Sequence, residues 1–151
     1  MGGEEDTVGE RVEDRITIHA PLEVVWNTIT DLPAYPDWAE GVTSIEVLEE
    51  HEDGSPHQAT FHVDAKVSQI TYSIEYAYDG DDIRWHLVEG ETLSQLDGLY
   101  ELTDDDGSTV VRYALEIDMD LPLPGFMKKR AARTILDQGL HGLKARAESV
   151  G

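Results

Sequence analysis

The chain has 151 residues and a mass of 16.8 kDa, enough for one domain of ordinary size but not for two. Eleven Lys and Arg stand against 32 Asp and Glu, so the formal charge is −21 at pH 7, which argues against nucleic-acid binding and disfavours docking of the whole chain on an anionic membrane. The absence of cysteine excludes disulfides, thiolate metal sites and a cysteine nucleophile.

The chain begins with a stretch rich in Gly, Asp and Glu. We expect residues 1–10 to form a disordered acidic tail and residues 11–149 to form a single domain. The start lacks the basic and apolar regions of a signal peptide, and no apolar run approaches the roughly 20 residues of a membrane-spanning helix. We therefore expect a cytoplasmic protein with no stable membrane insertion.

The first elements after the tail are a strand and two short helices. Val12, Ile16 and Ile18 alternate with polar residues, which predicts a strand from about residue 11 to 19. Pro21 suits the first turn of a helix that runs to about residue 30. Residues 31–40, which contain two prolines, predict a turn and a second short helix.

From about residue 42 to 120 the apolar period changes to two, which predicts an antiparallel meander. Asp-Gly pairs at positions 53–54, 79–80 and 106–107 separate alternating runs and are strong hairpin signals. The pair Asp97-Gly98 lies inside a run and predicts a bulge or bend. The six expected strands cover residues 42–50, 58–67, 70–78, 83–89, 93–103 and 109–119.

A long helix is expected at the end of the chain. Pro122 and Pro124 stop the meander, and residues 125–149 carry a roughly helical apolar pattern. Gly139 and Gly142 indicate a kink or close packing against another backbone, and a hinge is the alternative. The expected apolar stripe consists of Met127, Ala131, Ile135, Leu140, Leu143 and Ala147.

The alternation assigns the meander one uncharged face and one charged face, the pattern of an antiparallel sheet with one wet side. Seven strands at about 4.8 Å spacing span about 30 Å, whereas one helix is only about 10–12 Å wide. We therefore expect the sheet to curl around the last helix and to leave a hollow. The candidate ligand-binding residues are Phe61, Val63, Tyr72, Ile74, Tyr76, Trp85, Leu87, Tyr100, Tyr113, Met127, Ala131 and Ile135.

Several local motifs in this order are similar to one known superfamily. They occur at residues 16–21, 23–26, 31–38, 85–90, 96–100 and 122–130. The sequence resembles the START-like (SRPBCC) superfamily, which includes polyketide cyclase/dehydrase and lipid-transport proteins, and it is most similar to small actinobacterial-type single-domain members. The resemblance implies an α+β helix-grip fold, in which a curved seven-stranded antiparallel sheet surrounds a long C-terminal helix, with two short helices after the first strand. It also implies a ligand cavity between sheet and helix.

The residues favour binding over catalysis. Arg84 and Arg112 fall on the charged face, and the uncharged face offers only phenols, which are poor general bases at neutral pH. His57 and His62 are five apart, which predicts opposite faces of one strand and surface positions. We expect no catalytic residue, no metal site and no cofactor.

The sequence thus predicts a binding or carrier protein for a hydrophobic small molecule, such as a polyketide, isoprenoid or lipid. One alternative is a polyketide aromatase/cyclase or dehydratase acting in the same cavity, which inward-facing Arg84, Arg112 or histidine would favour. Another is a protein-interaction module that uses Trp38 and the last helix, which a fully packed interior would favour.

Charge is distributed unevenly along the chain. Residues 1–120 hold five Lys and Arg against 30 Asp and Glu, whereas residues 121–151 hold six against two. One interpretation is a solvated helix face that complements the acidic sheet. The other is that Lys128, Lys129 and Arg130 guide an acidic ligand or a membrane headgroup to the cavity mouth.

Overall fold

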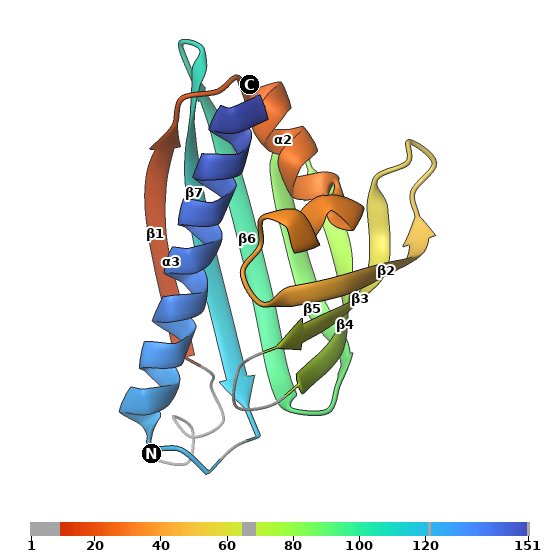
Figure 1. Ribbon diagram of the computed structural model, residues 1–151, viewed down its shortest axis with the longest axis vertical. Helices are drawn as coiled ribbons and strands as arrows, with labels where there is room; N and C mark the ends of the chain where they lie inside the picture. The colour runs from red at the N-terminus through yellow and green to blue at the C-terminus, as the bar shows by residue number, and fades with distance from the viewer. Residues whose placement is uncertain (1–9, 65–68, 121, 151) are drawn as a thin grey trace.

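The computed structural model describes residues 10–64, 69–120 and 122–150. All seven strands form one antiparallel sheet in the order β1-β7-β6-β5-β4-β3-β2 (Figure 1). This arrangement confirms the expected helix-grip fold. The elements are β1 (Glu10–Ile18), α2 (Leu22–Thr30), the 3₁₀ helix η1 (Leu32–Asp37), β2 (Val42–Glu50), β3 (Pro56–Asp64), β4 (Gln69–Asp79), β5 (Asp82–Gly90), β6 (Leu93–Asp105), β7 (Ser108–Met119) and α3 (Gly125–Val150).

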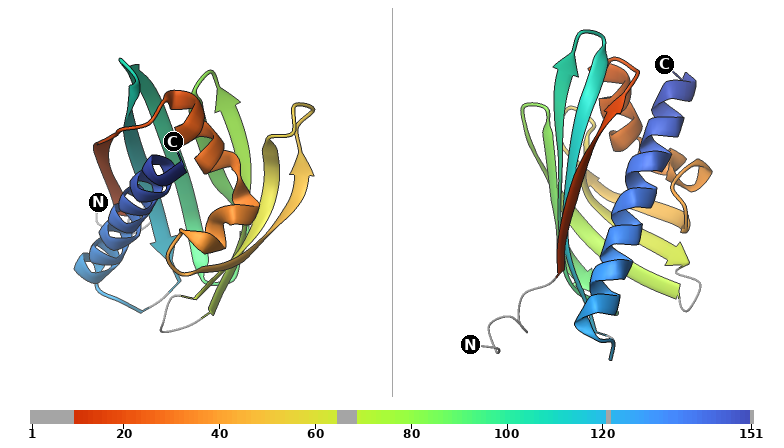
Figure 2. Two further views of the ribbon diagram at one scale, coloured as in Figure 1. Left: turned by 45° about the horizontal axis from the view of Figure 1, so that its top comes forward. Right: turned by 90° about the vertical axis from the view of Figure 1, so that its left-hand side faces the viewer.

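The helices lie on the concave side of the curved sheet. Helix α3 packs along β1 and β7, α2 packs on α3, and η1 packs on β2 (Figure 2). The helices therefore cover the part of the concave face formed by the neighbouring strands β1 and β7 more completely than the part formed by β2, β3, β4 and β5. None of the helices in the described part of the chain is long and apolar enough to cross a membrane.

The tight turns follow the hairpin signals. Asp105 pairs with Ser108, so that only Asp106 and Gly107 connect β6 to β7. Their φ angles are 55° and 91°, and these positive values are what a two-residue turn matched to strand twist requires. The Asp-Gly pair is therefore the local cause of this hairpin.

The start of the first strand and the form of the second short helix differ from the sequence expectation. Glu10, assigned to the tail, is the first residue of β1, because it pairs with Ile117. The second short helix is a single 3₁₀ segment, since two prolines within it prevent a continuous α-helical ladder. The expected end of the second meander strand at residues 65–67, like residues 1–9 of the tail, lies outside the described residues.

The apolar stripe on α3 is correct only in its C-terminal half. Leu140, Leu143 and Ala147 are buried as expected, but Met127 and Ile135 are 43% and 40% exposed. The first half of the helix buries Ala132 and Leu136 instead, which continue the same face at a period of 3.6 residues. The expected stripe fails because Ile135 and Leu140 are five residues apart, and residues at that spacing lie on different faces of an α-helix.

Three glycines make room for aromatic rings. At Gly98 no bulge occurs: the residue pairs in register with both Trp85 and Leu115, and the Trp85 indole lies on its backbone. Of the two features expected at Asp97-Gly98, a bulge or a bend, the bulge is therefore wrong. A Cβ at Gly139 would lie 3.1 Å from the Tyr113 ring, and one at Gly142 would lie 3.2 Å from the Trp38 carbonyl oxygen, so the α3 glycines serve close packing.

Candidate functional site

The concave face gathers every tyrosine of the chain. The sequence contains six, of which five lie on strands β4, β6 and β7 and one, Tyr35, lies on η1. Their phenols are close enough to influence one another. Burial is the largest cause that raises the pKa of Tyr76, and its neighbours raise that pKa further; these neighbours are Tyr72, Tyr78, Tyr100 and Tyr113. We call this set, together with Tyr35, the tyrosine cluster.

Trp85 on β5 joins the cluster rings into one aromatic surface. Its ring centroid lies 5.2 Å from that of Tyr100, 5.9 Å from that of Tyr113 and 6.2 Å from that of Tyr76. Tyr100 and Tyr113 themselves are 4.5 Å apart. These spacings are those of attractive tilted ring pairs, so the surface is a packed aromatic wall.

Phe61 extends the wall toward β3. It stacks on Tyr72 with ring centroids 5.4 Å apart and meets the edge of Tyr35 at 6.1 Å. The helix η1 thus contributes an aromatic ring that faces the wall from the other side of the concave space.

The six phenols differ in whether the protein satisfies their hydroxyl groups. Tyr35 donates to the backbone carbonyl of Ile29 at 2.5 Å, and Tyr78 donates to that of Pro56 at 2.7 Å. Within the described part of the chain, no hydrogen bond is formed by the hydroxyls of Tyr72, Tyr76, Tyr100 and Tyr113.

These four hydroxyls reach space that water can enter. Among the described residues, every side-chain nitrogen or oxygen that is sealed from solvent has a hydrogen-bond partner. A hydroxyl without a partner is therefore not sealed, although Tyr113, for example, is only 7% exposed overall. The aromatic wall consequently carries hydroxyl groups that are neither sealed from solvent nor bound by the described residues, and apolar surface with a few such polar groups is typical of small-molecule sites.

The phenols act as neutral hydrogen-bonding groups. Burial is the largest cause that raises the pKa of Tyr35, Tyr72, Tyr76, Tyr100 and Tyr113 above the usual value of about 10. They keep their protons at neutral pH and can donate to a carbonyl or accept from a hydroxyl. They cannot remove a proton from a ligand at that pH.

We expect alkaline titration to reveal this burial. Because folding raises the pKa, stability is intact below about pH 10 and falls above it, where the unfolded chain ionises first. Ultraviolet difference spectra at rising pH should show no gradual ionisation of Tyr76, Tyr100 or Tyr113, and all should ionise together with loss of the circular dichroism signal. Gradual ionisation of all six tyrosines near pH 10 in the folded protein would contradict the buried cluster.

The arginines expected on the charged face are on the outer, convex side. Arg112 Nε donates to Glu101 at 2.6 Å, and its Nη1 reaches Glu13 at 3.3 Å. The hydrogen bond from Arg112 lowers the pKa of Glu101 below its ordinary value. Arg84 is exposed on β5, on the same side as His86. Neither guanidinium approaches the tyrosine cluster.

The strand histidines also form an outer network with carboxylates. Glu75 lies between two imidazoles, with His57 Nε2 at 3.0 Å and His86 Nε2 at 3.2 Å. The pairing of β2 with β3 skips His57, and this bulge places His57 beside Glu75 and His62 beside Glu46 on one face. The expected placement on opposite faces is therefore wrong. No group of three or more His, Asp or Glu in the described residues is arranged to hold a metal ion.

The predicted ligand-binding residues fall into three groups by exposure. The strand residues lie together on the concave face, whereas Met127 and Ile135 are on a solvent-exposed side of α3 that turns away from its buried stripe. Tyr35 was not among the predicted ligand-binding residues, and the sequence feature that pointed to it was its position in the motif at residues 31–38. The buried residues are Phe61, Ile74, Tyr76, Tyr100 and Tyr113; the half-buried ones are Val63, Tyr72, Trp85, Leu87 and Ala131.

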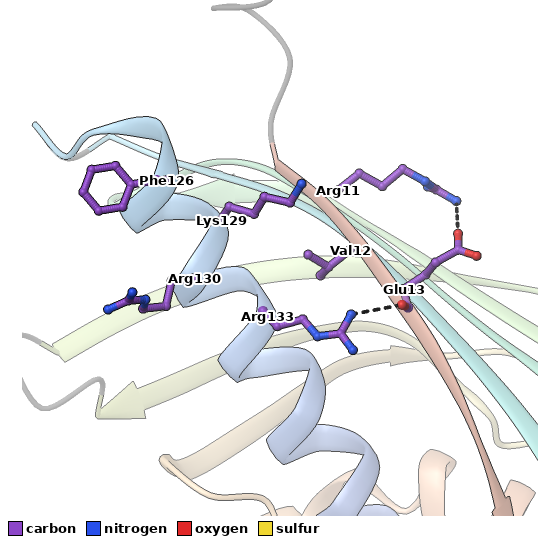
Figure 3. Close-up of a pocket in the computed structure, with 7 residues that line it drawn as sticks. All are labelled: Arg11, Val12, Glu13, Phe126, Lys129, Arg130 and Arg133. Atoms are coloured by element: carbon purple, nitrogen blue, oxygen red, sulfur yellow. Dashed lines mark hydrogen bonds and ion pairs between the residues drawn. The ribbon is translucent and has the colours of Figure 1, made fainter.

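The described residues also form surface hollows apart from the aromatic wall. One, of about 430 Å³, lies between β1 and the start of α3 and is lined by Arg11, Lys129 and Arg133 among others (Figure 3). Another, of about 300 Å³, lies between α2, η1 and the end of α3, beside Trp38 and Arg146.

Comparison with known proteins identifies the family. Residues 10–148 match the family described as polyketide cyclase / dehydrase and lipid transport. The chain belongs to this family. The match covers all the strands and almost all of α3, so the family extends over the whole described domain.

Solved structures share the family fold at low sequence identity. A START superfamily protein from Mycobacterium smegmatis is 23% identical, with a TM-score of 0.88 over 95% of this chain and 100% of the other. The Zhui aromatase/cyclase from Streptomyces sp. R1128 is 18% identical, with a TM-score of 0.77 over 92% and 93%. A protein from Thermus thermophilus is 19% identical, with a TM-score of 0.78 over 93% and 99%. At these identities the likeness concerns the fold.

Proposed function

We propose that the protein is a binding or carrier protein for a hydrophobic small molecule such as a polyketide, isoprenoid or lipid. The ligand lies on the concave face against the aromatic wall formed by Trp85 and the tyrosine cluster. The observation that carries the proposal is the set of four cluster hydroxyls that have no hydrogen-bond partner among the described residues and are not sealed from solvent.

The two parts of the site have different roles. The rings supply apolar area, and apolar burial contributes about 25 cal/mol per Å² before the costs of association. The free hydroxyls orient the ligand, because a carbonyl or hydroxyl placed against them gains a hydrogen bond that the empty protein lacks. A ligand with a flat apolar body and one or two oxygens fits this surface best.

A cyclase or dehydratase activity is the rival proposal. Such chemistry needs a group that exchanges a proton with the ligand near neutral pH. The phenols hold their protons, Arg112 is bound to Glu101, and His57 and His86 share Glu75 on the convex face. Binding without conversion therefore has the better support.

Uptake of the fluorescent probe prodan, a neutral naphthalene that carries one ketone, tests the proposal. We expect micromolar uptake by the parent protein and about tenfold weaker binding by Trp85→Leu, since leucine is smaller than indole and the lost apolar contact area is worth about 1–2 kcal/mol at about 25 cal/mol per Å². Replacing Tyr76, Tyr100 and Tyr113 together by phenylalanine should weaken binding about fivefold, the value of one hydrogen bond, and shift the emission of bound prodan to the blue.

Tyr35→Phe and Tyr78→Phe are matched controls, because their hydroxyls already bind backbone carbonyls. They should leave prodan affinity unchanged and reduce the free energy of unfolding by about 1 kcal/mol each. Equal prodan binding by the parent and Trp85→Leu would overturn the proposed site. Native mass spectrometry of freshly purified protein then gives the mass of any ligand that co-purifies.

A further inference from the structure

Exposed apolar side chains gather near the start of α3. Phe126 is 68% exposed, and it lies beside Met127, which is 43% exposed, in the first turn of the helix. The other large apolar side chains exposed in the described residues, Leu48 and Val88 among them, are scattered. Single exposed apolar residues are ordinary, but a group of them marks an interaction surface.

Two cations on the same turns lack a partner. Lys128 pairs with Asp118 at 3.2 Å, and Arg133 pairs with Asp14 at 2.5 Å. Lys129 and Arg130, in contrast, form no ion pair with any residue in the described ranges. The start of α3 therefore combines free positive charge with exposed apolar groups.

The hollow between α3 and β1 adds to this positive surface. Figure 3 shows Lys129 and Arg133 reaching toward β1, where Arg11 lies, while Phe126 and Arg130 point to the other side of the helix. The acid that lines the hollow, Glu13, is already bound by Arg11 at 2.9 Å and by Arg112. The hollow is thus lined mainly by cations.

We propose that the first turns of α3, whose residues Phe126, Met127, Lys129 and Arg130 together we call the α3 basic face, dock the protein peripherally on a bilayer of anionic lipids. The two cations meet the headgroups, and Phe126 and Met127 enter the boundary between headgroups and acyl chains. A bilayer suits this face because it accepts protruding apolar side chains without needing a shaped complement. A protein partner would have to supply a pocket for Phe126.

The formal charge of −21 opposes adsorption most strongly in orientations that turn the convex side of the sheet toward the lipid. The carboxylates of the sheet, such as Glu75 and Glu101, lie on its convex side, whereas α3 lies on the concave side (Figure 2). At physiological salt, charges farther than about 8 Å from the lipid surface are largely screened. Among the described acids near the start of α3, Asp118 is paired with Lys128, whereas the carboxylate of Glu10 lies 4.0 Å from where a Cβ on Gly125 would be and weakens docking.

Co-sedimentation of the full chain with lipid vesicles tests the proposal. We expect binding to vesicles of phosphatidylcholine mixed with phosphatidylglycerol, none to phosphatidylcholine alone, and loss of binding as salt is raised. Lys129→Glu and Arg130→Glu should each weaken binding by at least about fivefold, since a cation near an anionic surface contributes roughly that factor. Phe126→Ser should also weaken binding, and Glu10→Gln should strengthen it.

Matched controls separate the α3 basic face from general effects. Arg84→Glu makes the same charge change on the convex side, and Val88→Ser removes an exposed apolar group elsewhere, so both should bind as the parent does. Parent-like binding by Lys129→Glu, or absence of parent binding at low salt, would overturn the proposal. Binding of soluble polyglutamate instead of vesicles, with the same dependence on Lys129, would replace it by an acidic protein partner. Prodan uptake reports the proposed ligand site on the concave face independently of vesicle binding, and it should not change in these variants.

Discussion

Replacing Gly98 by alanine is expected to reduce the free energy of unfolding by about 2–3 kcal/mol, the range of an overpacked core. A Cβ at this position would lie 2.5 Å from Trp85 Nε1 and closer still to Cε2, so the indole must leave its place. The neighbours Tyr100 and Tyr113 would lose their ring contacts with it. Urea unfolding measures the loss, and prodan binding should weaken in parallel.

Two companion variants make this expectation specific. Gly125→Ala adds the same methyl group where the nearest atom is 4.0 Å away, and it should leave stability within about 0.5 kcal/mol of the parent. In the Trp85→Leu background, Gly98→Ala should cost much less, because the ring it displaces is gone. If Gly98→Ala and Trp85→Leu had additive effects on the free energy of unfolding in a double-mutant cycle, the result would contradict the role assigned to Gly98, which is to make room for the indole.

The sheet could be predicted because each of its determinants is local. Alternation assigns Val111, Tyr113, Leu115 and Ile117 to one face of β7, and all four are buried. The Asp106-Gly107 turn then fixes the register of β6 on β7 without information from the rest of the chain. The same reasoning places Arg112 on the outer face, where it pairs with Glu101.

Features that depend on contacts between distant segments could not be predicted in this way. A glycine inside a strand indicates either a bulge or the close approach of another group, and only the position of Trp85 decides between them at Gly98. The bulge that brings His57 to Glu75 leaves no mark in the hydrophobic period. Tyr35 joins the cluster because η1 folds over the concave side, which alternation along the strands does not reveal.

The register of α3 was ambiguous for a different reason. Its first half contains two apolar pairs, Ala131-Ala132 and Ile135-Leu136, and either member of each pair fits a helical period of 3.6 residues. Burial selects Ala132 and Leu136, which are fully buried, and leaves Ile135 toward solvent. The choice follows from where β1 and β7 lie, and it decides which side of the helix is free for an external partner.

Leu136→Ala is therefore expected to destabilise the protein by about 2–5 kcal/mol, since the side chain is fully buried beneath α3 and its loss leaves a cavity. Ile135→Ala removes a side chain of the same volume at the next position, yet it should cost less than about 1 kcal/mol, because that side chain is 40% exposed. The ratio of the two effects in urea unfolding measures the register directly. Similar losses for both variants would mean that α3 presents a different face to the sheet, and the exposed apolar group at its start would then lose its significance for membrane docking.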